Sequence, residues 1–144
     1  MNRIKIIVDA MGGDVLYLPQ VEGSVMAAKE LDVDLVLVGE RDKIEAELSK
    51  YNFPKEKISI VEAEDRITNH DEPVKAIKQK KNASLVVAAK LLTQGKGDAL
   101  VSSGATGGVL AVGTLLVGRI DGVSRPALAP LIPTDTGGSL LLDA

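Results

Sequence analysis

Short apolar runs alternate along the chain with longer segments in which apolar side chains recur at helical spacing. Apolar runs of this kind, bounded by turn residues, predict strands. The pattern places strands at residues 4–8, 34–39, 58–61 and 99–101. The run at 34–39 is uninterrupted after its first residue, which is typical of a parallel strand covered on both faces.

Helices are predicted between these strands. Apolar side chains recur at helical spacing in residues 19–31, which indicates an amphipathic helix. Asp42, with Glu45 three residues later, is expected to cap a second helix that reaches about residue 50. Asp71 is expected to cap a third helix that has Pro73 in its first turn.

The second half of the chain continues this alternation. Ser84 is expected to cap a buried helix over residues 85–92 that ends near Gly95. Residues 109–117 are apolar but too short to cross a membrane, and we expect them to belong to the core. Residues 125–133 contain three prolines, which favours an edge strand or an extended segment.

The last predicted elements are a turn at Gly137–Gly138 and a buried strand at 139–143. Alternating strands and helices predict a mostly parallel α/β sheet. At 144 residues with 45% hydrophobic content, residues 1–144 are expected to form a single α/β domain.

Composition narrows the possible functions. A formal net charge of -3 and 2% aromatic residues exclude the basic, aromatic surface that nucleic-acid binding needs. The chain has no cysteine and one histidine, His70, which excludes disulfides, thiolate chemistry and a histidine metal cluster. The N-terminus lacks the apolar core of a signal peptide, so we expect a cytoplasmic location, and a peripheral position at the membrane stays open.

Candidate chemistry concentrates at residues 98–120, where a short strand meets two serines, a glycine-rich turn and an apolar helix. The first backbone N–H groups of a helix have no partner in the chain, and small residues let an anion approach them. We therefore expect a phosphate site, although the same small residues could serve only close packing. The candidate donors are the hydroxyls of Ser103 and Thr106 and the backbone of Gly104, Ala105, Gly107 and Gly108.

Acidic residues flank a second glycine turn, Gly12–Gly13, at the end of the first predicted strand. Open α/β sheets place ligands at this end of their strands. Asp9 could therefore orient a lysine or a ligand hydroxyl, whereas Asp14 favours turn chemistry. These aspartates and glycines are expected to shape the floor of the site.

Lysines supply the candidate positive charge. Lys75, Lys78 and Lys81 are spaced by three and share one arc of the predicted helix, whereas Lys80 points elsewhere. Lys78 and Lys81 are candidates for neutralising phosphate or for docking an acidic protein, and a solvated helix face is the alternative. His70 is assigned no role.

Several common motifs are absent. The chain has neither GxxxxGK[ST] nor GxGxxG, which argues against nucleotide binding. It also lacks GxSxG, which argues against serine hydrolase chemistry.

Taken together, the segments resemble the phosphate:acyl-carrier-protein acyltransferase family of bacterial phospholipid synthesis, known as PlsX. The matching segments, in the order found in that family, are residues 8–14, 71–81, 102–108, 117–120, 125–130 and 133–134. Each segment alone is modestly specific, whereas the set is highly specific and covers nearly the whole chain.

The resemblance implies a Rossmann-like three-layer α/β/α sandwich, usually a homodimer. It implies transfer of a fatty acyl group from acyl-carrier protein to inorganic phosphate, which gives acyl phosphate without a metal or a dissociable cofactor. Acyl-carrier protein is acidic, and a downstream membrane acyltransferase is a further implied partner. The alternatives are a fragment that associates without catalysing and a phosphotransacetylase-like enzyme that uses acyl-coenzyme A.

The chain departs from this family at three places. Val15, Leu16 and Tyr17 stand where the family has His-Ala-Pro, and Ala105 replaces the asparagine of the serine-glycine turn. The family also continues after Leu-Leu-Asp with Gly-Ala-Asn, whereas this sequence ends at Ala144. We therefore expect the N-terminal part of a longer acyltransferase, with a sheet that is incomplete at its C-terminal side.

Overall fold

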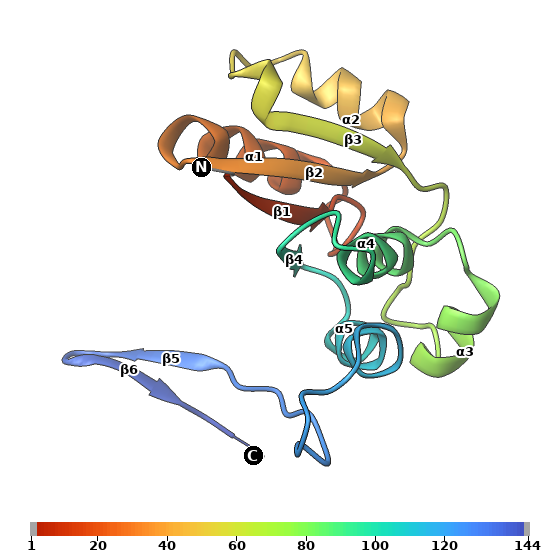
Figure 1. Ribbon diagram of the computed structural model, residues 1–144. Coiled ribbons are helices and arrows are strands. Elements are labelled where there is room, and N and C mark those ends of the chain that lie inside the picture. Colours follow the sequence, from red (N-terminus) through yellow and green to blue (C-terminus); the bar gives the residue numbers. More distant parts are fainter. Residues whose placement is uncertain (1–2, 143–144) are drawn as a thin grey trace.

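Four parallel strands form the central sheet of the computed structural model, which describes residues 3–142 (Figure 1). The strands are β1 (Ile4–Asp9), β2 (Val33–Gly39), β3 (Ile58–Glu62) and β4 (Ala99–Ser102). Their order across the sheet is β3-β2-β1-β4, and each neighbouring pair is parallel. The strands predicted from the apolar runs are confirmed to within one residue at each end.

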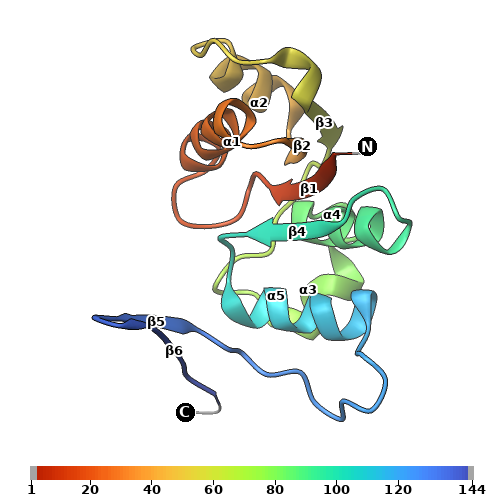
Figure 2. The same cartoon turned by 60° about the vertical axis from the view of Figure 1, so that its left-hand side comes forward.

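Helices cover both faces of this sheet. α1 (Leu18–Glu30) and α2 (Arg41–Leu48) lie on one face, and α4 (Ser84–Thr93) lies on the other (Figures 1 and 2). Leu37 of β2 packs beneath the first two helices, and Ile7 of β1 packs against α4. The expected α/β fold of Rossmann-like type is confirmed.

Two shorter helices pack with α4 and not on the sheet itself. They are α3 (Pro73–Gln79) and α5 (Thr106–Val112), and α5 continues directly into a π-helical turn, Gly113–Val117. The expectation that residues 109–117 belong to the core is only partly met, because Val112 is buried whereas Leu115 is 54% exposed. Within residues 3–142, the helices are all too short or too polar to reach across a bilayer.

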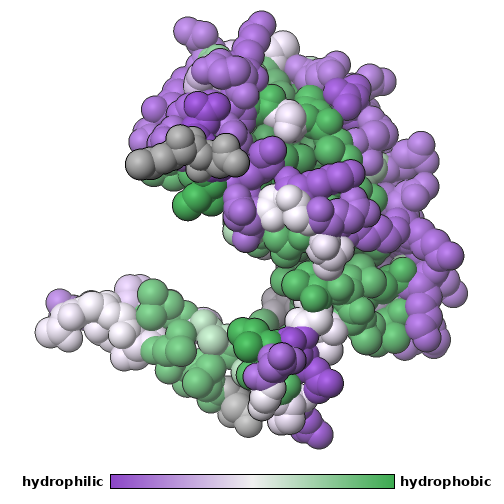
Figure 3. Space-filling model, viewed as in Figure 1, coloured by the Kyte–Doolittle hydropathy of each residue, from purple (hydrophilic) through white to green (hydrophobic). Residues whose placement is uncertain are grey.

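The C-terminal residues form an antiparallel hairpin of β5 (Leu131–Thr134) and β6 (Gly137–Leu140) that stands away from the sheet (Figure 1). Gly137 and Gly138 belong to β6, so the predicted turn there is wrong, and residues 135–136 make the turn instead. The predicted buried strand is also wrong, because both strands are exposed and hydrophobic residues lie on the hairpin surface (Figure 3). Asp143, the end of that predicted strand, lies outside the described residues.

The predicted capping residues do not cap their helices. Asp42 and Ser84 lie within the first turns of α2 and α4, and Asp71 lies two residues before Pro73. The residues at the cap positions are Glu40, Glu72 and Ala83, none of which makes a side-chain hydrogen bond to its helix. For Asp71 another partner explains the difference, since its carboxylate accepts hydrogen bonds from Thr68 in the preceding loop.

Candidate active site

The carboxyl ends of β1 and β4 meet where Asp9 pairs with Ser102. The Ser102 hydroxyl donates to Oδ2 of Asp9 over 2.7 Å and accepts a hydrogen bond from the backbone N–H of Gly104 over 3.0 Å. Asp9 is 2% exposed, and its Oδ1 accepts the backbone N–H of Met11 over 3.2 Å. The Asp9 carboxylate therefore holds the turn after β4 in place, and among the described residues its hydrogen bonds go to Ser102 and Met11 and not to a lysine.

The Gly12–Gly13 turn packs closely against these bonds. A Cβ atom at Gly12 would lie 2.8 Å from Oδ2 of Asp9 and 2.8 Å from the backbone nitrogen of Gly104. Gly13 has a φ of +88°, in the left-handed region that favours glycine. Both positions therefore need glycine, one for space and one for backbone conformation.

The hydroxyl of Ser103 is bonded within the same turn. It donates to the carbonyl oxygen of Gly12 over 3.2 Å and accepts a hydrogen bond from Nε2 of Gln20 over 3.0 Å. Nε2 of Gln20 also donates to the Gly12 carbonyl, whereas its Oε1 is buried without a partner among the described residues. Ser103 therefore joins the two glycine turns, and it could donate to an anion only by exchanging its bond to Gly12.

A cavity of about 690 Å³ opens beside these turns. It is lined by residues 13–15, 19–20, 66–70 and 103–106, and we call it the polar pocket. Its walls follow the carboxyl ends of β1, β3 and β4, the edge at which α/β sheets bind ligands. Asp14 lines this pocket and is exposed.

The first turn of α5 borders the polar pocket. Ala105 is the N-cap residue and Thr106 begins the helix, and both line the pocket. The backbone N–H groups of Thr106 and Gly107 have no acceptor within the helix, as at any helix start. The N–H of Gly104 is already bonded to Ser102, so it is not one of the open donors that the sequence suggested.

Gly108 serves packing, the alternative explanation for the small residues. It is buried, and a Cβ atom there would lie 3.2 Å from Cγ2 of Ile67 and 3.7 Å from Cδ2 of Leu85. Neither Gly107 nor Gly108 lines the polar pocket. Residues 103–106 of the glycine-rich segment therefore line the pocket, whereas Gly108 packs in the core.

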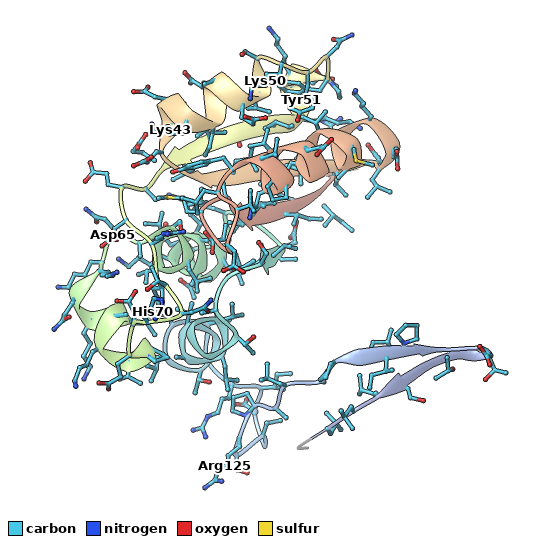
Figure 4. The ribbon with its side chains drawn as sticks, turned by 180° about the vertical axis from the view of Figure 1, so that it is seen from behind. Lys43, Lys50, Tyr51, Asp65, His70 and Arg125 are labelled. Carbon is cyan, nitrogen blue, oxygen red and sulfur yellow. The ribbon has the colours of Figure 1, made fainter. Side chains whose placement is uncertain are left out.

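Arg66 and His70 bring nitrogen donors to the polar pocket, and the sequence pattern pointed to neither. Both lie on the loop between β3 and α3, where Figure 4 shows His70 beside α5. Arg66 is half-buried and has no ion pair within residues 3–142, and it also lines a second cavity together with Glu40 and Glu64. Lys78 and Lys81, the predicted phosphate-neutralising residues, do not line this pocket.

The predicted lysine face is shorter than expected. Because α3 ends at Gln79, Lys81 lies beyond the helix and does not share an arc with Lys75 and Lys78. Lys75 forms an ion pair with Glu72 one turn earlier. Lys78 and Lys81 are exposed and unpaired within the described part of the chain.

Asp71 and Lys80 fasten the loop that carries Arg66. Oδ2 of Asp71 accepts hydrogen bonds from the backbone N–H of Thr68 over 2.7 Å, from its hydroxyl over 2.8 Å and from Nζ of Lys80 over 2.9 Å. Nζ of Lys80 also donates to the carbonyl oxygen of Arg66 over 2.9 Å. The bonds from Thr68, followed by the bond from Lys80, lower the pKa of the Asp71 carboxyl from 3.8 to about 2.

This Asp71 contact is expected to weaken in acid. Because folding lowers the pKa of Asp71, its ionised form stabilises the folded chain above pH 3.8, and the stabilisation is lost as the pH falls to about 2. We expect Asp71→Asn to lower the melting temperature near neutral pH, and the difference from the unchanged chain to vanish toward pH 2. Thermal unfolding followed by circular dichroism measures this, with the exposed loop variant Asp121→Asn as control. A difference that stays constant down to the lowest pH would contradict this role of Asp71.

Residues 15–17, where the chain departs from the family pattern, bring no imidazole to the polar pocket. Val15 lines the pocket with an apolar side chain. Tyr17 has a φ of +65° and its hydroxyl donates to Oε2 of Glu40 over 2.8 Å. Burial, together with this hydrogen bond, raises the pKa of the Tyr17 phenol above its usual range. His70 is the histidine among the residues that line this pocket.

The donor set suits a tetrahedral oxyanion. Arg66 and Thr106 line one cavity at the start of α5, and their guanidinium, hydroxyl and helix-terminal N–H groups are hydrogen-bond donors. Within residues 3–142, no three His, Asp or Glu side chains are grouped so that they could hold a metal ion.

Comparison with known proteins identifies the family of the chain. The model of the family described as fatty acid synthesis protein matches residues 4–144. The phosphate acyltransferase of Alkaliphilus oremlandii is 48% identical over 98% of this chain and 42% of its own length. Those of Clostridioides difficile and Clostridium kluyveri are 47% and 45% identical, each over 96% of this chain and 41% or 42% of their own length.

The chain thus spans about two fifths of the length of these curated relatives. The family match runs through the glycine turn after β1, the α3 segment and the turn before α5, where the sequence resemblance was found. The chain belongs to the fatty acid synthesis protein family, whose curated members include these phosphate acyltransferases.

Proposed function

We propose that the chain provides the phosphate-binding part of an acyltransferase that moves a fatty acyl group from acyl-carrier protein to inorganic phosphate. A phosphate oxygen attacks the carbonyl carbon of the thioester, and the carbon–sulfur bond breaks. The carrier thiol leaves and takes up the proton that phosphate loses, so the products are acyl phosphate and free carrier. The names of the relatives support phosphate and acyl transfer, and the family description supports a fatty acyl group.

The convergence of Arg66 with the first turn of α5 on one pocket carries this proposal. Arginine binds phosphate through two parallel N–H donors, and a helix N-terminus attracts negative charge. Hydrogen bonds to a charged group contribute about 1.5–3 kcal/mol each, so this donor set can hold a doubly charged anion in water. α5 has seven residues and continues directly into the π-helical turn, so the helical segment that begins at Thr106 extends to Val117.

Orientation and electrostatic stabilisation are the proposed sources of catalysis, because phosphate is a competent nucleophile once it is held near a thioester. Arg66 binds and orients the phosphate. The N–H and hydroxyl groups of Thr106 stabilise the negative charge that develops on the thioester oxygen. The bond between Ser102 and Asp9 keeps that first turn in position while the charge develops.

The exposed lysines after this pocket are proposed to dock the acyl-carrier protein. α3 begins against the first turn of α5, whose Thr106 lines the pocket, since the ring of Pro73 lies 3.4 Å from the position of a Cβ atom at Gly107. Lys78 lies in the last turn of α3 and Lys81 lies two residues beyond the helix, and both carry unpaired charge within residues 3–142. An acidic carrier bound there could reach the polar pocket with its flexible thioester arm, and opposite charge would speed its association.

The test uses a chimera in which this chain replaces the matching residues of the Alkaliphilus oremlandii enzyme. Acyl phosphate is trapped as the hydroxamate, with acyl-carrier protein or acyl-coenzyme A as donor. We expect Lys78→Ala/Lys81→Ala to raise KM for the carrier roughly threefold to tenfold, because exposed charges contribute about 0.2–1 kcal/mol each. We expect the value for acyl-coenzyme A to stay unchanged.

Lys29→Ala/Lys55→Ala is the matched control, since both lysines are exposed and lie on α1 and before β3. An equal rise in KM for both donors would contradict docking through α3. Faster turnover of acyl-coenzyme A than of acyl-carrier protein would favour the phosphotransacetylase-like alternative, and no acyl phosphate from either donor would contradict the proposed reaction.

A further inference from the structure

Arg66 borders two cavities that differ in charge. One is the polar pocket, and the other is a cavity of about 540 Å³ whose charged lining residues are Glu40, Lys43, Glu64, Asp65 and Arg66 itself (Figure 4). Carboxylates and a guanidinium attract each other strongly in a half-buried site. Arg66 nevertheless forms no ion pair within residues 3–142, and other donors in the structure account for this.

Lys80 holds the carboxylates that precede and follow Arg66 along its loop. Its Nζ donates to Oδ2 of Asp71 over 2.9 Å and lies 3.8 Å from Oδ1 of Asp65, within ion-pair distance. The same Nζ donates to the backbone carbonyl oxygen of Arg66 over 2.9 Å. Lys80 is half-buried, so its charge is only partly screened by water. Its ammonium group therefore competes with the Arg66 guanidinium for both carboxylates.

The glutamates of the second cavity compete less for Arg66. The Tyr17 hydroxyl donates to Oε2 of Glu40 over 2.8 Å, so this carboxylate already has a hydrogen-bond donor. Glu64 is exposed, and exposed ion pairs contribute little. Asp65 is half-buried and directly precedes Arg66, so it is the carboxylate best placed to pair with the guanidinium when Lys80 is removed.

Backbone contacts keep Asp65 in place independently of Lys80. The backbone N–H of Ser84 donates to the carbonyl oxygen of Asp65 over 2.8 Å, and the N–H of Asp65 donates to the carbonyl oxygen of Asn82 over 3.4 Å. Asp65 and Ala83 also form an isolated parallel bridge. Removal of the Lys80 side chain therefore frees the Asp65 carboxylate while the main chain around it stays attached.

We infer that Lys80 is a positioning residue of the phosphate site, which engages the carboxylates of Asp65 and Asp71 and so keeps the Arg66 guanidinium free to bind the anion. This inference rests on the proposed function, because phosphate is the anion that Arg66 is proposed to bind. Without Lys80, the Asp65 carboxylate pairs with Arg66 and competes with phosphate for its donors. Lys80 does not line the polar pocket, so it acts through Arg66 and does not contact the anion.

Chemical modification of Arg66 tests this arrangement without phosphate. Phenylglyoxal reacts with the neutral guanidine, and an ion pair slows the reaction because it favours the charged form. We expect Arg66 to react about threefold to tenfold more slowly in Lys80→Met than in the unchanged chain, the effect of one partly exposed ion pair. Peptide mass spectrometry measures the rate, with the exposed Arg125 of the same chain as internal reference.

A double variant separates competition for Arg66 from a change in loop shape. Asp65→Asn/Lys80→Met lacks both the ammonium group and the competing carboxylate. We expect the reactivity of Arg66 to return to within about twofold of the unchanged chain, because the two substitutions act on one interaction and are not additive. Asp71 keeps its hydrogen bonds from Thr68 in this variant.

Lys57→Met is the matched control. Lys57 is also half-buried, and its Nζ donates to the backbone carbonyl oxygens of Ala28 over 3.1 Å and Leu31 over 2.8 Å. It forms no ion pair in the described part of the chain and lies before β3, at the opposite end of that strand from the Arg66 loop. We expect this variant to leave the modification of Arg66 unchanged.

Calorimetry with inorganic phosphate measures the consequence for binding. We expect Lys80→Met to weaken phosphate binding about threefold to tenfold and Asp65→Asn/Lys80→Met to restore most of the loss. If the unchanged chain binds no phosphate, the proposed function fails, whereas the modification rates still decide whether Lys80 keeps Arg66 unpaired.

Three results would overturn the inference. The first is a modification rate of Arg66 in Lys80→Met that equals or exceeds the rate in the unchanged chain. The second is a slow rate in Lys80→Met that Asp65→Asn does not restore, because Lys80 then acts only through the shape of the loop. The third is an equal slowing in Lys57→Met, because the loss of any half-buried lysine then has the same effect.

Discussion

Replacing Arg66 by alanine is expected to weaken the binding of inorganic phosphate about 10- to 100-fold, because one bidentate, charge-assisted contact is lost. Arg66 lines the polar pocket and has no ion pair within the described residues, so the substitution leaves no carboxylate without a partner. Its loop stays fastened through the backbone carbonyl of Arg66, which accepts the bond from Lys80. Isothermal titration calorimetry with phosphate measures the affinity of both proteins.

Two further variants identify the source of this effect. Arg66→Lys keeps the charge without the planar pair of donors, and we expect an affinity between those of the unchanged chain and Arg66→Ala. Arg3→Ala removes an arginine that pairs with Asp34 near the start of β1, away from the pocket, and should bind phosphate normally. Equal phosphate affinity in Arg66→Ala and Arg3→Ala would contradict the assignment of Arg66.

Replacing Gly12 by alanine is expected to destabilise the chain by about 1–3 kcal/mol, the usual cost of adding a methyl group to a packed site. The new Cβ atom would lie 2.8 Å from both Oδ2 of Asp9 and the backbone nitrogen of Gly104. Neither neighbour is the end of a mobile side chain, because Asp9 is 2% exposed and Gly104 contributes its main chain. The turn after β4 must therefore shift, and we expect phosphate affinity to fall as well.

Gly23→Ala is expected to change the stability of the chain in the opposite direction. Gly23 lies in α1, and a Cβ atom there would meet nothing within 4 Å. Alanine in a helix interior is more favourable than glycine by about 0.5–1 kcal/mol, so the variant should be stabilised. Urea unfolding of both variants measures the free energies, and a similar loss in both would show that the contact at Gly12 is not the cause.

Much of the fold could be predicted from the apolar pattern, because the inner strands β1 and β2 are buried on both faces. Ile7 and Val38 are completely buried on one side of the sheet while Leu37 is buried on the other, and such strands have few polar positions. The helix starts could not be predicted from capping residues, because Asp71 finds stronger partners in Thr68 and Lys80. At such positions, hydrogen bonds to other side chains outweigh the local preference of Asp for a helix cap.

The sequence pointed to the part of the candidate site whose residues are neighbours in the chain. It missed the part that the strand order of the sheet brings to the pocket. The turn at residues 102–106 is local, so its small residues pointed to the pocket directly. Arg66 follows β3, which is separated from β4 by two strands, so no spacing in the sequence links the two. The available signal was that the loop follows a parallel strand, whose end lies at the same edge as Asp9. Lys81 was expected at the site but does not line the polar pocket. It lies beyond α3, which ends at Gln79.

The bonds that join Asp9, Ser102 and the Gly104 amide have a thermodynamic consequence for the ligand. They cross from β1 to the end of β4, so the proposed phosphate site keeps its shape only while these two strands remain paired. If phosphate binds there as proposed, fraying of β4 releases it. Binding in the pocket and the pairing of β4 with β1 are in this way thermodynamically linked, so that each stabilises the other.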